Sequence, residues 1–161
     1  MDFNGSNPAN TNLSILMNPR NALLAPYTEN AAIYKCPADR STVRKNGKIV
    51  PHILSMSMNA VIEGSDDHFT PNQYCWWIGV PPYRVYKKMG DITAPSPSLF
   101  WILLDEHPDT INNGDMSMKC DARGSDAQLV DYPASYHNEA CGLSFADGHI
   151  WKRDSVLANV D

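Results

Sequence analysis

The chain has 161 residues, the length of one domain, and 13 basic against 18 acidic side chains give it a formal net charge of −5. This balance excludes the positive surface that binders of nucleic acid or of acidic membranes need. Hydrophobic residues make up 43% of the sequence, enough to fill a core, and no apolar run reaches the ~18 residues of a membrane span. Twelve prolines and nine glycines leave no room for long helices. We expect a single loop-rich globular domain over residues 1–161, with residues 1–12 poorly ordered.

The first third of the chain predicts a short helical segment followed by strands. Residues 13–34 show the strongest helical pattern of the chain. Asn18-Pro19 fits a helix start, because Asn can cap the helix N-terminus and Pro suits the first helical position. Residues 33–36 resemble a brief strand. A basic turn over residues 44–48 then leads into a strand over residues 49–58, where side chains alternate with a period of two.

The later part of the chain predicts further strands. Residues 63–73 form a polar loop, and residues 83–88 fit another strand or extended piece. Residues 99–104 (LFWILL) are apolar on both faces, which is typical of a central strand. These elements indicate an α+β fold, in which a short N-terminal helical segment packs on an antiparallel β-sheet.

A β-hairpin is predicted at the C-terminal end. Two strand-like runs, residues 141–146 and 149–152, flank Asp147-Gly148, the favoured sequence of a two-residue type I′ turn. That turn would pair Phe145 with Ile150, and we expect both side chains in the core.

The four cysteines leave two alternatives open. They are Cys36, Cys75, Cys120 and Cys141. An even set permits two disulfides in any of three pairings, whereas widely spaced thiols in a reducing compartment would simply be buried. The sequence contains no C-x-x-C pair, the spacing that would indicate a zinc site or a redox centre.

Several motifs occur in an order that resembles one family. His137, nine intervening residues and Asp147-Gly148 match the H-x9-D-G signature of type II secretion pseudopilin-like (protein G-like) proteins, of the kind abundant in Planctomycetes and Verrucomicrobia. Residues 34–40 (YKCPADR), 57–59 (SMN) and 104–109 (LDEHPD) are further matches. The resemblance extends from about residue 13 to residue 152, nearly the whole chain.

The resemblance implies a location and a role. Such proteins carry a prepilin-type leader and a hydrophobic helix that anchors them in the inner membrane, and their globular heads are exported. We therefore expect this chain to be a periplasmic or cell-envelope head without that N-terminal helix, making no membrane contact itself. Its expected role is non-enzymatic, with other pseudopilin subunits or an exported substrate protein as partners. An oxidising compartment also favours at least one disulfide.

An acidic loop follows the predicted central strand. Its candidate metal ligands are Asp105, Glu106, Asp109, Asn112 and Asp115. Oxygen donors of this kind suit a calcium ion, and related pseudopilins bind calcium in a loop near the C-terminal end of the head. The spacing does not fit an EF-hand, and the alternative is a polar loop whose side chains cap turns.

Three histidines offer an alternative metal site. His107, His137 and His149, together with Glu106, would form a metal-dependent enzyme site or a carbohydrate-binding module if the chain brought them together. The simpler alternative is that Asp147 serves the turn and that His137 hydrogen-bonds within the fold.

The middle of the chain is rich in aromatic residues, and the motifs of common enzymes are missing. Tyr74, Trp76 and Trp77 combine apolar area with polar tips, so they are candidates for binding a partner, the alternative being core packing. The sequence holds no G-x-S-x-G, no P-loop and no G-x-G-x-x-G motif. A non-enzymatic role fits these observations best.

Overall fold

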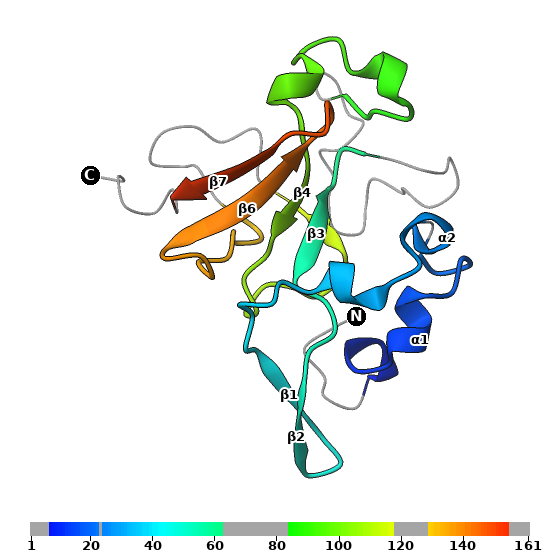
Figure 1. The fold of residues 1–161 in the computed structure, drawn as a ribbon, viewed down its shortest axis with the longest axis vertical. Coiled ribbons are helices and arrows are strands. Elements are labelled where there is room, and N and C mark those ends of the chain that lie inside the picture. Colours follow the sequence, from blue (N-terminus) through cyan, green and yellow to red (C-terminus); the bar gives the residue numbers. More distant parts are fainter. Residues whose placement is uncertain (1–6, 23, 63–83, 118–128, 155–161) are drawn as a thin grey trace.

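The structure, a computed structural model, describes residues 7–22, 24–62, 84–117 and 129–154. The strands are β1 (Thr42–Lys45), β2 (Lys48–Pro51), β3 (Met56–Asn59), β4 (Trp101–Asp105), β5 (Asp115–Met116), β6 (Ala140–Phe145) and β7 (Ile150–Asp154). The helical turns are η1 (Pro8–Asn10), α1 (Leu13–Leu16), α2 (Ala25–Thr28), η2 (Ala31–Tyr34), η3 (Met89–Asp91) and η4 (Pro97–Leu99). Short helices, two sheets and long connections confirm the predicted α+β, loop-rich fold (Figure 1).

The main sheet has five strands in the order β5-β3-β4-β6-β7. All neighbours are antiparallel except β3 and β5, a parallel pair that the sequence did not predict. The central position of β4 confirms the interpretation of its apolar run. The strand begins only at Trp101, because Pro97 starts η4 and leaves Leu99 70% exposed.

The N-terminal helical layer differs in detail from the prediction. Helix α1 begins after Asn12, whose side chain accepts a hydrogen bond from the backbone N–H of Ser14. The predicted start at Asn18 is wrong, since its side chain closes a turn by accepting from the N–H of Arg20. Residues 7–12 are also better ordered than expected, because η1 forms there and Asn10 is buried.

Two of the predicted strands are wrong in place or extent. Residues 31–34 form η2 instead of starting a strand, because Asn30 caps that turn by accepting from the N–H of Ala32. The single strand expected over residues 49–58 is divided between β2, which pairs with β1 in a separate hairpin, and β3 in the main sheet. Buried Ile53 and Leu54 lie in the link between them.

The C-terminal hairpin forms, but its register is shifted by one residue. Ser144 pairs with Ile150, and the N–H of Phe145 donates to the carbonyl of His149, which leaves a three-residue loop. Gly148 takes the left-handed conformation (φ 90°), as in a turn followed by a G1 bulge. The shift turns Ile150 outward, 79% exposed, so its predicted core position is wrong.

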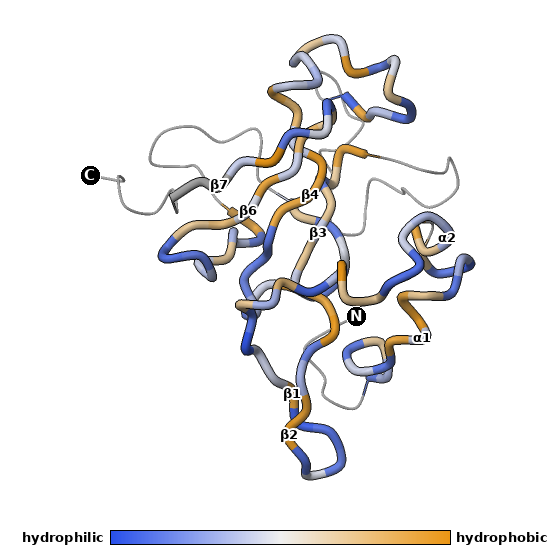
Figure 2. The backbone as a smooth tube through the Cα atoms, in the orientation of Figure 1, coloured by the Kyte–Doolittle hydropathy of each residue, from blue (hydrophilic) through white to orange (hydrophobic). Residues whose placement is uncertain are grey.

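A buried apolar cluster lies at the end of the sheet near η3 and η4. Tyr86, Ile92, Phe100 and Ala146 form it, and the rings of Tyr86 and Phe100 lie 4.7 Å apart at 60°. Tyr86 makes an isolated bridge to Ile62, so of the two alternatives for residues 83–88 the described part is not a strand but fits an extended piece. Figure 2 shows hydrophobic residues along β3 and β4 and in the N-terminal layer.

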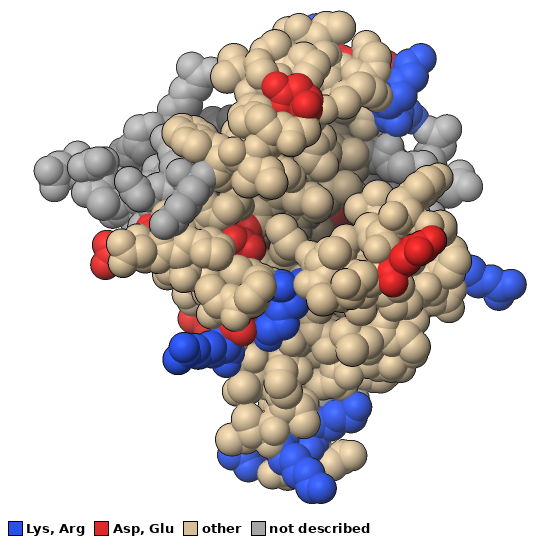
Figure 3. All heavy atoms as spheres, viewed as in Figure 1, with Lys and Arg blue, Asp and Glu red and all other residues tan. Residues whose placement is uncertain are grey.

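Charge is distributed unevenly over the surface. Basic side chains gather at the tip of the β1–β2 hairpin, at the bottom of Figure 3, whereas basic and acidic side chains are both scattered over the rest of the face drawn there. Among the described residues, no helix has the length and apolar character to cross a membrane.

Candidate functional site

Three segments that are distant in sequence meet at the end of β4. Cys36 follows η2, Asp105 is the last residue of β4, and His137 lies just before β6. The backbone N–H of Cys36 donates to Ser55 Oγ at 2.7 Å, which fixes its segment against the residue that precedes β3. The N–H of Ala134 donates to the carbonyl of Asp105 at 2.8 Å, which fixes the segment leading to His137.

A tight turn places His137 beside β6. Asn138 and Glu139 both adopt positive φ, 61° and 64°, a conformation that is uncommon for residues other than glycine. The turn brings the carbonyl of Ala140 within 3.1 Å of the backbone N–H of His137. The imidazole is thereby held over the buried end of the sheet.

One imidazole nitrogen faces both a thiol and a carboxylate. His137 Nε2 lies 3.3 Å from Cys36 Sγ and 3.2 Å from Asp105 Oδ2. The Asp105 side chain is 4% exposed and Cys36 is buried, whereas the His137 side chain is 36% exposed. The three donor atoms all lie within 4.8 Å of one another. They form a compact sulfur, nitrogen and oxygen group that opens to solvent on the histidine side.

Asp105 approaches the backbone closely, and this requires a glycine. The N–H of Gly142 donates to Asp105 Oδ2 at 3.0 Å. A Cβ at position 142 would lie only 3.0 Å from the same oxygen, closer than such contacts normally are. The glycine in β6 therefore leaves the room that this carboxylate occupies.

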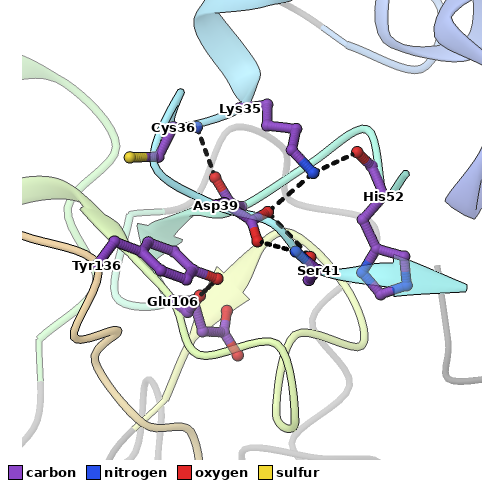
Figure 4. A network of polar contacts seen from close by, with 8 residues as sticks. Lys35, Cys36, Asp39, Ser41, His52, Glu106 and Tyr136 are labelled. Carbon is purple, nitrogen blue, oxygen red and sulfur yellow. Dashed lines mark hydrogen bonds and ion pairs between the residues drawn. The ribbon is translucent and has the colours of Figure 1, made fainter.

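A second polar network surrounds Asp39, close to Cys36. Lys35 Nζ lies 3.0 Å from Asp39 Oδ2, and the Ser41 N–H and hydroxyl both donate to the carboxylate (Figure 4). Burial alone raises the pKa of Asp39, but the hydrogen bonds from Ser41 and the Lys35 charge hold it below its usual value. Tyr136 donates to the carbonyl of Glu106 at 3.2 Å; burial, followed by the negative charge of Asp39, raises its pKa. These contacts fix the residues on either side of Cys36 and His137.

Glu106 lies apart from the thiol group. It is almost completely buried, and it accepts a hydrogen bond from the Ser57 hydroxyl. Its Oε1 atom has no hydrogen-bond partner among the described residues. Burial, with a further contribution from the charge of Asp131, raises the pKa of Glu106 to about 7, while the Ser57 hydrogen bond opposes the rise. Burial also raises the pKa of both Asp115 and Asp131.

The structure divides the proposed calcium ligands among different surroundings. Asp105 joins Cys36 and His137, whereas Glu106 bonds to Ser57. Asp109 is exposed, and its carboxylate lies 3.7 Å from His107 Nδ1. Asp115 lies near Glu106, and Asn112 is exposed. Neighbouring strand residues point to opposite faces, which is why Asp105 and Glu106 separate.

The three histidines of the alternative metal site are not brought together. His137 lies beside Ala140 and His149 lies opposite Phe145, so they are at opposite ends of β6, about 16 Å apart at 3.3 Å per residue. His149 Nδ1 contacts Asp147 Oδ1 at 2.5 Å, and its ring stacks on Phe145. Asp147 and Gly148 of the H-x9-D-G motif therefore serve the hairpin loop, away from His137.

The structure describes only two of the four cysteines and none of the three aromatic candidates. Cys36 and buried Cys141 are not bonded to each other. The predicted disulfides stay predictions. The remaining candidates, Cys75, Cys120, Tyr74, Trp76 and Trp77, lie outside the described residues.

Sequence reasoning missed Cys36 as a neighbour of His137, and it missed Asp39, Tyr136 and Gly142. A signal was present, because Cys36 and Asp39 belong to the motif at residues 34–40 and Asp105 to the motif at residues 104–109. Comparison of the chain with protein-family models, with curated proteins and with solved structures finds no match in any of the three.

Proposed function

We propose that the chain is the exported head domain of a pseudopilin-like protein, held at the inner membrane by an N-terminal helix of the full-length protein. In this proposal the head is non-enzymatic and lies in the periplasm or cell envelope. It contacts other pseudopilin subunits or an exported protein in a type II secretion or pilus-like assembly.

The observation that carries the proposal is the meeting of the resemblance motifs in space. Cys36 from the first motif contacts His137 from the last, and His137 contacts Asp105 from the third. Ser57 from the second motif bonds to Glu106 from the third. These contacts bring residues of all four motifs together around the end of β4. Their contacts support treating them as one signature, and hence support the family on which the proposed role depends.

The surface of the N-terminal layer supports a role in contacts. Four large apolar side chains are exposed within 21 residues of α1, α2 and η2 and their links: Leu13, Leu24, Tyr27 and Ile33. Tyr27 is 85% exposed. A partner protein that covered this layer would bury their apolar area.

Photo-crosslinking in cells of the organism that carries the gene tests this function. A photoreactive phenylalanine analogue at Tyr27 of the full-length protein is expected to crosslink, in the envelope fraction, to a subunit with a prepilin-type leader or to an exported protein. The same analogue at Asn46, in the exposed tip of the β1–β2 hairpin, is the matched control and is expected to crosslink much less. Recovery of the protein outside the envelope, or equal crosslinking from both positions, would contradict the proposal.

A further inference from the structure

We propose that Cys36, Asp105 and His137 bind one zinc ion, or a divalent transition metal of similar softness, with a water molecule in the fourth position. The site does not rest on the function proposed above, because it needs only these three side chains and not the contact surface, although the same contacts also support the family proposed there.

The distances between the donor atoms agree with a zinc site. Tetrahedral zinc, with bonds of about 2.3 Å to sulfur and about 2.0 to 2.2 Å to nitrogen and oxygen, separates sulfur from nitrogen by about 3.5 Å and nitrogen from oxygen by about 3.4 Å. The corresponding distances here are 3.3 Å and 3.2 Å. These two pairs would need to separate by only about 0.2 Å to reach ideal zinc geometry. The third pair, Cys36 Sγ and Asp105 Oδ2, lies within 4.8 Å.

The donor types select the metal. A thiolate and an imidazole prefer zinc and similar transition metals, whereas calcium and magnesium need a shell of oxygens. The charges of one thiolate and one carboxylate equal the charge of a divalent ion, so binding would leave no net charge in this largely buried group. The solvent-facing side of His137 leaves room for the water that completes four-coordination.

The ligands are held in place by contacts that do not involve the ion. Ser55 fixes the backbone of Cys36, and the turn at Asn138 and Glu139 fixes His137. The Gly142 N–H binds the same Asp105 oxygen that faces the imidazole. Such outer contacts orient metal ligands before binding and strengthen the site.

The same geometry argues against a Cys-His-Asp catalytic triad. In a triad the nucleophile and the acid contact different ring nitrogens, so that the acid orients the imidazole while the other nitrogen takes the proton. Here the thiol and the carboxylate both face Nε2. Convergence of three donors on one point suits an ion better than a proton relay.

Binding of zinc and cobalt to the whole purified chain tests the proposal. The chain is stripped with EDTA, kept reduced with a phosphine, and titrated with Zn²⁺ by calorimetry. One ion per chain is expected, together with a higher unfolding midpoint, since an ion bound only by the folded state stabilises it. Co²⁺ in the same site is expected to give the thiolate charge-transfer band and the ligand-field absorption of tetrahedral cobalt.

Variants assign the site to its residues. Cys36→Ser, Asp105→Asn and His137→Ala are each expected to weaken zinc binding by at least about 100-fold, and only Cys36→Ser removes the charge-transfer band while other cysteines remain. Gly142→Ala, which moves the carboxylate, is expected to weaken binding about tenfold. His149→Ala is the matched control, because His149 pairs with Asp147 in the hairpin loop, and it is expected to bind zinc as the wild type does.

Three results would overturn the proposal. They are the absence of stoichiometric zinc binding by the folded wild-type chain, undiminished affinity in the three ligand variants, and equal loss in His149→Ala. Circular dichroism of the metal-free proteins checks that each variant folds. If Cys36→Ser does not fold, Asp105→Asn decides the question, because Asn keeps the size of the side chain and an oxygen for the Gly142 N–H.

Discussion

The buried carboxyl of Glu106 gives the fold a stability that depends on pH. Its pKa rises from the ordinary value of 4.5 to about 7, primarily because burial disfavours the charged form. Below pH 4.5 the group is neutral in both the folded and the unfolded chain. Between pH 4.5 and 7 the folded chain holds a proton that the unfolded chain has lost, so the free energy of unfolding falls as pH rises through this window.

The size of the effect follows from the pKa difference. The two pKa values differ by about 2.5 (7 − 4.5), and one pKa unit corresponds to about 1.4 kcal/mol. Because the unfolded chain is already half ionised at pH 4.5, the free energy of unfolding falls by about 3 kcal/mol between pH 4.5 and pH 8. For a chain of this length, this lowers the unfolding midpoint by roughly 6 to 12 °C. Asp115 and Asp131, whose pKa values are also raised by burial, act in the same direction.

Glu106→Gln isolates the contribution of this one group. Glutamine keeps the size of the side chain and an oxygen that can accept from Ser57, but it does not ionise. Urea unfolding of both proteins is measured at several pH values between 4.5 and 8, in EDTA so that no metal binds at neighbouring Asp105. The wild type is expected to lose about 3 kcal/mol relative to the variant across this range. If the free energies of unfolding of the wild type and the variant changed with pH in parallel, burial would not raise the pKa of Glu106 as argued.

Two further substitutions test the packing and the hairpin. Phe100→Ala removes the ring that packs on Tyr86 and is expected to lower the free energy of unfolding by about 3 to 5 kcal/mol, measured by urea unfolding; a loss below about 1 kcal/mol would contradict the burial of this cluster. Gly148→Ala is expected to destabilise the chain by about 1 to 2 kcal/mol in thermal unfolding, because φ is 90° there although a methyl group would meet no atom. Gly114→Ala, equally uncrowded but without a positive φ, is the control, and an equal loss in both variants would reject the backbone explanation.

Hydrophobic pattern was enough to predict the centre of the fold. A strand buried on both faces needs apolar residues at consecutive positions, so the run at residues 99–104 identified β4 without knowledge of its neighbours. The strand over residues 49–58 shows the limit of the same method. Its alternation continues through the point where the chain leaves one sheet and enters another, because residues in the link are buried for reasons of tertiary packing.

The hairpin shows how a correct turn signal can give a wrong register. Asp-Gly suits a two-residue type I′ loop, but Gly in the left-handed region also suits a three-residue loop with a bulge. The chain forms the three-residue loop. In this loop the Asp147 carboxylate accepts a hydrogen bond from the His149 backbone N–H and also contacts the His149 ring nitrogen Nδ1. One residue of difference changes which side chains face the core, and Ile150 lies outside as a result.

The candidate site could not be assembled from the sequence, because its members are joined only by tertiary structure. Cys36 and His137 are 101 residues apart, and no local spacing relates them. The sequence placed Cys36 among candidate disulfides, Asp105 among calcium ligands and His137 in a family motif, each for a reason that depended on near neighbours. Their contact requires the η2 segment, the end of β4 and the turn before β6 to meet, which periodicity does not specify.

Asp105, the last residue of β4, and Glu106, the residue after it, show two solutions to the same physical problem. Both carboxyls are buried, and an isolated buried charge is too costly to keep. Glu106, facing a hydroxyl and other carboxyls, avoids the cost by holding a proton up to about pH 7. Asp105 instead receives a backbone N–H from Gly142 and faces His137, so it lies where a positive charge, either imidazolium or metal, can compensate it. In the zinc site proposed above, the charge of the divalent ion would equal the summed charge of the Asp105 carboxylate and a Cys36 thiolate, so the ion would compensate both donors.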